Sequence, residues 1–302
     1  MEHRTYRHDK QRKNVNPNLL HMQNFQRTWN TVQERVHLAN HAVHGASLDA
    51  SSYKARHNTA RASQKFSDEL PYDHVGKVYA NILGALPDFI DAKQKITQSR
   101  KRVHGYGLSK SEHATEVDKL IAFNDIIRSI IEQHPKIRPD DITSIVTAAA
   151  HRYKYTDREI QTILGETHGV IIGMNHELAF ESVLYYLPEG FKVHEENDDA
   201  HGADYIVGCP NGTVVYIDVK ASPELERKGR EEQRDYFENL GKEPPKNELI
   251  LFSGFRMNDF SNDSPWRPKH EAVQQVLPHV LDELLHASGD NTDSVQKALV
   301  NY

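Results

Sequence analysis

The spacing of the apolar residues changes along this chain, and that change limits the folds it can adopt. Over residues 18–165 apolar residues recur every three or four positions, for example at Trp29, Val32 and Val36. This spacing predicts amphipathic helices that cover one another's apolar faces, as in a helical bundle. After Gly173 one more helical segment is followed by short runs rich in β-branched residues, which predict strands. The sequence therefore predicts an α+β chain whose two parts differ in structure.

The elements can be placed from this pattern and from the turn-forming residues between them. We expect the helices of the first part to cover residues 18–45, 75–86, 89–102, 112–133, 141–153 and 156–164. In the second part we expect helices at 175–187, 223–240 and 270–287 and strands at 191–195, 203–208, 213–221 and 248–255. Asn211-Gly212 separates two apolar runs and predicts a hairpin that pairs the second and third strands antiparallel.

The charge distribution supports the same division. We expect a basic flexible arm at 1–17, a helical bundle domain at 18–165, an α+β domain at 166–290 and a tail at 291–302. The first 165 residues carry a formal charge of +7, whereas the remaining residues carry -13. Contact with a polyanion is therefore expected mainly from the first part, and carboxylate chemistry from the second.

Several classes of protein are excluded by composition. No apolar run approaches the roughly 20 residues that cross a bilayer, so we expect no membrane span. The charged N-terminal segment is not followed by the apolar stretch of a secretory signal, which indicates a cytoplasmic protein. Cys209 is the single cysteine, so an intrachain disulfide and a cysteine-based zinc site are excluded. A bound metal would have to use oxygen or histidine ligands.

Charged residues in the second part are placed to meet. Asp218 and Lys220 alternate with apolar residues on the 213–221 strand, so both side chains project from one face. Asp204 begins the preceding strand, and the hairpin folds that strand back towards Asp218. Glu177 lies on the helix before the strands, on the same face as apolar residues; Glu181, one turn later, is an alternative.

These residues resemble the PD-(D/E)XK nuclease superfamily, which includes restriction endonuclease-like enzymes, Holliday junction resolvases and RecB-like nucleases. The resemblance covers residues 170–255, in the order αβββαβ, and implies a restriction endonuclease-like domain with a mixed central sheet after the helical domain. Ala203 stands where the family usually has proline, and Asp218 where glutamate is commoner. Gln233 and Tyr236 are similar to the Gln-x-x-Tyr element of RecB-like nucleases. His176 would then be the metal-binding histidine.

The resemblance implies a metal-dependent endonuclease, in which Mg²⁺ or Mn²⁺ neutralises charge on a scissile phosphate and acidifies a water molecule. Asp204 and Asp218 would be metal ligands, joined by the carbonyl of Val219. Glu177 would bind a second ion or orient a water molecule. Lys220 would position the attacking water or stabilise the transition state as a point charge.

Alternatives to a DNA nuclease remain open at this stage. A chain with this fold could bind nucleic acid or a protein partner without catalysis, because the charge of -13 on the second part would repel DNA. It could also cleave RNA, since nothing in the sequence separates a reader of the 2′-hydroxyl from a reader of DNA. The helical domain is expected to position substrate or to bind a partner, including a second copy of the chain.

Overall fold

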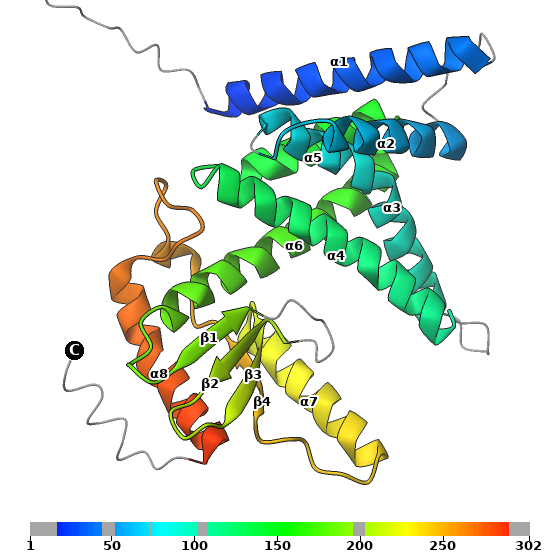
Figure 1. Cartoon of the computed structure of the whole chain (residues 1–302). Coiled ribbons are helices and arrows are strands. Elements are labelled where there is room, and N and C mark those ends of the chain that lie inside the picture. The colour runs from blue at the N-terminus through cyan, green and yellow to red at the C-terminus, as the bar shows by residue number, and fades with distance from the viewer. Residues whose placement is uncertain (1–16, 44–51, 73, 102–107, 196–202, 290–302) are drawn as a thin grey trace, which may run out of the picture. The chain divides into compact units, whose positions relative to one another are not determined.

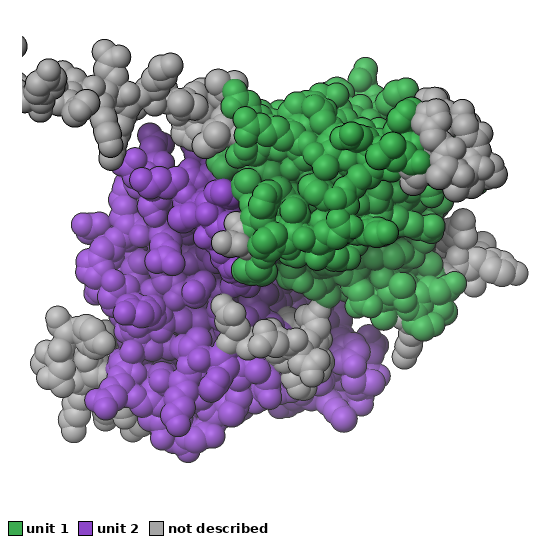
Figure 2. All heavy atoms as spheres, turned by 45° about the horizontal axis from the view of Figure 1, so that its top comes forward, with its two compact units in different colours: residues 1–126, 140–160 green, residues 127–139, 161–302 purple. Residues whose placement is uncertain are grey.

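The computed structural model describes residues 17–43, 52–72, 74–101, 108–195 and 203–289. The expected arm, apart from Pro17, and the expected tail lie outside these residues. The chain divides into two compact units, residues 1–126 with 140–160 and residues 127–139 with 161–302 (Figure 2). We expected a boundary at residue 165. The observed division lies a few residues earlier, and residues 127–139 belong with the second unit.

The first unit is helical. It contains α1 (Pro17–Val43), α2 (Tyr53–Asp68), α3 (Val75–Lys101), α5 (Pro139–Arg152) and the first part of α4 (Lys110–Gln133). Apolar faces of these helices bury large side chains such as Phe89 and Phe123, whose rings stack with centroids 4.1 Å apart. Among the described helices, none combines the length and the apolar composition needed to cross a bilayer.

Two helix predictions for this unit were wrong. A break was expected at Pro87, but α3 continues through it. Leu83, Leu86 and Phe89 around the proline are all buried, and this packing outweighs the loss of one backbone hydrogen bond. The helix α2 was not predicted at all, because its sequence is mostly polar and its buried positions are small residues such as Ala55.

The chain continues in one long helix where two were expected. The predicted helices at 156–164 and 175–187 are joined in α6 (Asp157–Leu184), which includes Gly165, Gly169 and Gly173. A glycine costs roughly 1 kcal/mol in a helix, and it does not force the helix to end. The break expected at these glycines is therefore absent.

The second unit contains a small mixed sheet, so the α+β class is confirmed. Its strands are β1 (Lys192–Glu195), β2 (Tyr205–Gly208), β3 (Val214–Lys220) and β4 (Glu248–Phe252), in the order β1-β2-β3-β4. The first three strands pair antiparallel, and β4 is parallel to β3. The predicted hairpin is confirmed: Gly212 turns with a φ of 86°, and its N–H donates to the Cys209 carbonyl over 2.9 Å.

Helices cover the sheet on both faces (Figure 1). Val215, Ile217 and Val219 of β3 enter an apolar core with Phe180 near the end of α6 and Leu284 of α8 (His270–Ser288). The helix α7 (Pro223–Asn239) packs against β3 and β4, and at Gly229 it lies against Ile250 and Lys220. The core face and the charged face of β3 thus separate as its alternation predicts.

Gly254, just after β4, allows a test of this packing. Its φ is +82°, and a Cβ there would stand 2.8 Å from Cγ2 of Val276. We expect Gly254→Ala to lower the free energy of unfolding by about 3 kcal/mol, the sum of a left-handed backbone and an overpacked contact. Gly212→Ala is the matched control, because Gly212 has a φ of +86° and open space around it. It should cost about 1 kcal/mol in urea unfolding; equal losses for both variants would contradict the steric argument.

Candidate functional site

The acid and the base of β3 lie together at its C-terminal end. Exposure alternates along the strand, with Val215, Ile217 and Val219 buried and Asp218 and Lys220 partly exposed. The Lys220 ammonium donates a hydrogen bond to Oδ1 of Asp218 over 2.6 Å. The two side chains therefore share one face, as the alternation predicts, and form a close ion pair.

Asp204 is brought to the same place by the hairpin. Its backbone N–H donates to the Ile217 carbonyl over 2.8 Å, and its Oδ2 accepts a hydrogen bond from the Val219 N–H over 2.7 Å. The Asp204 side chain also lowers the pKa of Asp218. Two acids 14 positions apart in the sequence thus meet at one point, because the hairpin register places the start of β2 beside the end of β3.

Glu177 of α6 completes the group of acids, which we call the acid cluster: Glu177, Asp204 and Asp218. Burial raises the pKa of Glu177, the Arg128 guanidinium opposes this rise, and the Asp218 carboxylate adds to it. The Tyr205 hydroxyl donates to the Glu177 carbonyl over 2.9 Å and ties this turn of α6 to β2. Asp218 thus acts on the pKa of Glu177, whereas Glu181 faces Arg128.

Burial raises the pKa of all three acids of the acid cluster. Burial raises the pKa of Asp204 to about 7, the Glu177 charge adds to the rise, and the hydrogen bond from Val219 opposes it. Burial also raises the pKa of Asp218, although the hydrogen bond from Lys220 lowers it. A cation bound beside these carboxylates would favour their ionised forms and lower their pKa values.

The carbonyl of Val219 faces the acid cluster. The Lys220 carbonyl accepts from the Ser253 N–H, so residue 220 bonds towards β4. The Val219 N–H points to the other edge of β3, towards β2, because it donates to Asp204. The N–H and carbonyl of one strand residue point in the same direction, so this carbonyl lies on the Asp204 side of β3.

The three auxiliary residues suggested by the resemblance are placed differently. Nδ1 of His176 lies 2.5 Å from Oγ of Ser253, and burial lowers the pKa of the imidazole. Gln233 donates to the Glu248 carbonyl over 3.4 Å, at the start of β4 rather than beside Asp218. Tyr236 is 62% exposed. Of these, only His176 lies on the same helical turn as Glu177.

Arg128 is a site residue that the sequence did not indicate. It acts on the pKa of Glu177, and its Nη2 lies 3.9 Å from Oε2 of Glu181. Arg128 comes from α4, about 50 positions before Glu177. No local motif predicts that contact, which arises only from the way α4 and α6 pack within the second unit. Glu181 itself is exposed and points to Arg128.

The donor set fits a hard divalent cation in chemical type. Within the described residues, no group of three His, Cys, Asp or Glu side chains is placed so that it could hold a metal ion. The Asp204 and Asp218 carboxyls lie at the end of β3, and the Val219 carbonyl lies on the Asp204 side of that strand. Mg²⁺ is commonly held by one or two carboxylates together with water and substrate phosphate, so a complete protein cage is not required.

Comparisons with protein-family models, with curated proteins and with solved structures found no match for this chain. Its function must therefore be inferred from the geometry of the acid cluster and Lys220.

Proposed function

We propose that this chain is a metal-dependent nuclease that hydrolyses phosphodiester bonds of DNA, with endonucleolytic cleavage at the acid cluster. The observation that carries the proposal is the meeting of Asp204 and Asp218 beside the Lys220 ammonium, which lies 2.6 Å from Asp218. Two carboxylates beside a lysine can hold a cation and a scissile phosphate together.

The order of elements supports the same proposal. From the end of α6 the chain runs through β1, β2, β3, α7 and β4, and β4 pairs parallel with β3. This is the αβββαβ order implied by the resemblance to PD-(D/E)XK nucleases. In a restriction endonuclease-like arrangement, which is part of the proposal, the acid cluster would be the active site.

Each residue has a distinct part in the proposed site. Asp204, Asp218 and the Val219 carbonyl would hold Mg²⁺ or Mn²⁺, which supplies charge neutralisation and an acidified water. Glu177 would orient a water molecule or contribute to a second ion. Lys220 would hold its ammonium against the phosphate as charge develops there. The close pair with Asp218 keeps Lys220 in reach of that position.

The test combines cleavage with metal binding. We expect the chain to nick or linearise supercoiled plasmid DNA in Mg²⁺ and to be inactive in EDTA. Calorimetry should show Mg²⁺ or Mn²⁺ uptake that is lost in the double variant Asp204→Asn, Asp218→Asn. The double variant Asp235→Asn, Glu238→Gln, which changes two exposed acids of α7, is the matched control and should bind as the parent does.

Two observations favour a second candidate function. The described residues lack a three-ligand group, and the second part of the chain carries a charge of -13. Both fit a nuclease-like domain that binds nucleic acid or a partner without catalysis. Absence of metal uptake and of cleavage would establish that candidate over hydrolysis. Cleavage of an RNA strand but not of plasmid DNA would keep the chemistry and change the substrate.

A further inference from the structure

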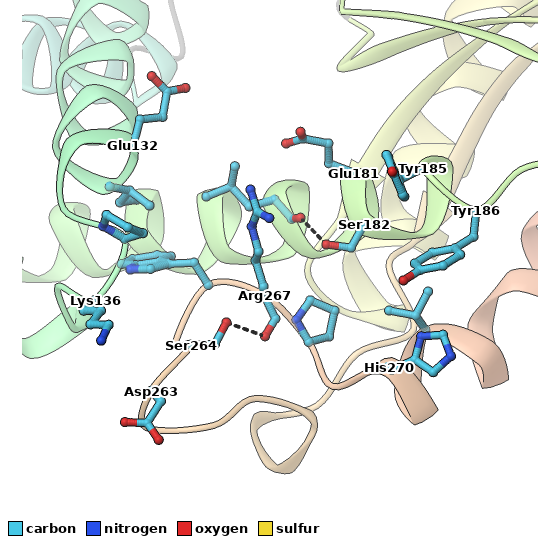
Figure 3. Close-up of a pocket in the computed structure, with 16 residues that line it drawn as sticks. Glu132, Lys136, Glu181, Ser182, Tyr185, Tyr186, Asp263, Ser264, Arg267 and His270 are labelled. Carbon is cyan, nitrogen blue, oxygen red and sulfur yellow. Dashed lines mark hydrogen bonds between the residues drawn. The ribbon is translucent and has the colours of Figure 1, made fainter.

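A pocket lies beside the acid cluster, within the second unit. Its volume is about 880 Å³, and it is lined by the end of α4, the end of α6, the start of α8 and the loop at 263–268 (Figure 3). Pockets of this size take drug-sized molecules, a class that includes nucleotides. The pocket adjoins the cluster through α6, because its lining residue Glu181 follows Glu177 by one helical turn, about 6 Å along the axis.

Hydrogen bonds hold the walls of this pocket in place. The buried Trp266 indole N–H donates to the Ile137 carbonyl over 2.6 Å and fixes the loop to the segment after α4. The Asn175 side chain donates to the Pro265 carbonyl over 2.9 Å and fixes the same loop to α6. The shape of the pocket is therefore set by the fold of the second unit rather than by a loose loop.

One wall of the pocket is a row of three rings. The Tyr185 and Tyr186 rings meet edge to face with centroids 5.5 Å apart, and the Tyr186 and His270 rings are 5.4 Å apart (Figure 3). Tyr185 is 84% exposed, although burial of such a ring on folding is favourable. Tyr186 is half-buried against the core, so Tyr185 is the more open ring of the two. Exposed aromatic rings of this kind are surfaces on which unpaired bases stack, at about 1–3 kcal/mol per base.

Both signs of charge line the pocket: the cations Lys136 and Arg267 and the acids Glu132, Glu181 and Asp263. Two of its acids, Glu132 and Glu181, both face Arg128, with nitrogen to oxygen distances of 3.6 and 3.9 Å. Arg267 and Lys136 also line the pocket, and neither has an acidic partner among the described residues. Figure 3 shows the Arg267 side chain rising from the loop into the middle of the pocket. These two cations are placed to contact phosphates.

We infer that this pocket binds an unpaired segment of the polynucleotide substrate, with bases on Tyr185 and Tyr186 and phosphates on Arg267 and Lys136. The inference rests on the proposed nuclease function and names its preferred substrate: a strand that is single at the cleavage point. In a duplex the base faces are covered by neighbouring bases, so they cannot stack on the tyrosines without being unstacked first.

Binding without cleavage tests the inference separately from hydrolysis. Fluorescence anisotropy in EDTA at low salt would use labelled (dT)12, labelled (U)12 and a 12-base-pair DNA duplex as probes. We expect the chain to bind one or both single strands more tightly than the duplex, and the comparison of (dT)12 with (U)12 identifies the sugar. Tyr185→Leu should weaken single-strand binding about tenfold, whereas Tyr185→Phe, which keeps the ring, should bind as the parent does.

The controls separate stacking from loss of structure. Tyr185 is largely exposed, so its replacement should leave the thermal midpoint unchanged, and Tyr72→Leu, at a tyrosine that is 75% exposed in the first unit, should leave binding unchanged. Arg267→Ala should reduce the salt dependence of binding by about one unit of slope. Equal affinity of the parent and Tyr185→Leu, or tighter binding of duplex than of single strands, would overturn the inference.

The outcomes for the pocket and for the acid cluster are distinguishable. Ring-dependent binding of single strands in EDTA supports the pocket whether or not Mg²⁺ later produces cleavage. Cleavage that depends on Asp218, together with binding that ignores Tyr185, would retain the nuclease and remove the pocket as its substrate site.

Discussion

Replacing Asp218 by asparagine is expected to reduce the rate of Mg²⁺-dependent DNA cleavage by roughly 10³-fold. Asparagine keeps the shape of the side chain but removes the negative charge that would hold the cation beside Lys220 and Asp204. The hydrogen bond that Lys220 donates to Oδ1 can persist with an amide oxygen, so the strand end should stay in place. The measurement is the single-turnover rate of plasmid nicking with enzyme in excess, so that weaker DNA binding does not conceal a slower chemical step.

The control for this variant is Asp235→Asn. It makes the same chemical change at an exposed position of α7, outside the acid cluster, and should leave the rate unchanged. Lys220→Gln should also slow cleavage while leaving Mg²⁺ affinity near that of the parent, because the lysine is assigned to the phosphate and not to the metal. A rate for Asp218→Asn within twofold of the parent would remove Asp218 from the chemistry and with it the proposed function.

The hairpin of the second unit was predictable because its signals are local. Alternation in β3 and the Asn211-Gly212 turn are enough to fix the hairpin, its register and the face that carries Asp218. The same rules failed where long-range packing decides whether a helix ends or continues. Pro87 and the glycines of α6 look like breaks in the sequence, yet the helices continue because the residues on both sides are held by tertiary contacts.

The candidate site was predictable to the same extent. Asp204, Asp218 and Lys220 meet because strand register brings them together, and register can be derived from sequence. The choice between Glu177 and Glu181 could not be made from helical spacing, since the two lie one turn apart on the same helix. The two differ in their tertiary neighbours: Asp218 raises the pKa of Glu177, whereas Glu181 faces Arg128. The contribution of Arg128 has the same tertiary origin.

The raised pKa values in the acid cluster should make the free energy of unfolding depend on pH. The pKa of Asp204 is about 7 in the folded chain, against 3.8 for an ordinary aspartate, mainly because the carboxyl is buried. Between these two values the folded state holds a proton that the unfolded state has released. The contribution of Asp204 to the free energy of unfolding should therefore fall as the pH rises from about 4 to about 7. Burial raises the pKa of Glu177 and of Asp218 as well, which adds to the fall in the same direction.

The variant Asp204→Asn isolates the contribution of Asp204 to this pH dependence. Asparagine has no proton to lose, and its carbonyl oxygen can still accept the hydrogen bond from the Val219 N–H. In EDTA, the stability of Asp204→Asn relative to the parent should rise between pH 4 and pH 7, on the order of 3 kcal/mol, and level off above pH 7. Urea unfolding at a series of pH values measures the difference, with Asp235→Asn as the control that should track the parent throughout.

Added Mg²⁺ should reverse the loss of stability at high pH in the parent but not in Asp204→Asn. A cation bound at Asp204 and Asp218 favours their ionised forms, so added Mg²⁺ should restore stability to the parent at pH 8 and leave Asp204→Asn nearly unchanged. This links the stability measurement to the proposed site, because an acid cluster that serves only as structure gains nothing from the ion. A stability difference that does not vary with pH would show that Asp204 is ionised in the metal-free fold and that the acids do not repel one another as their positions require.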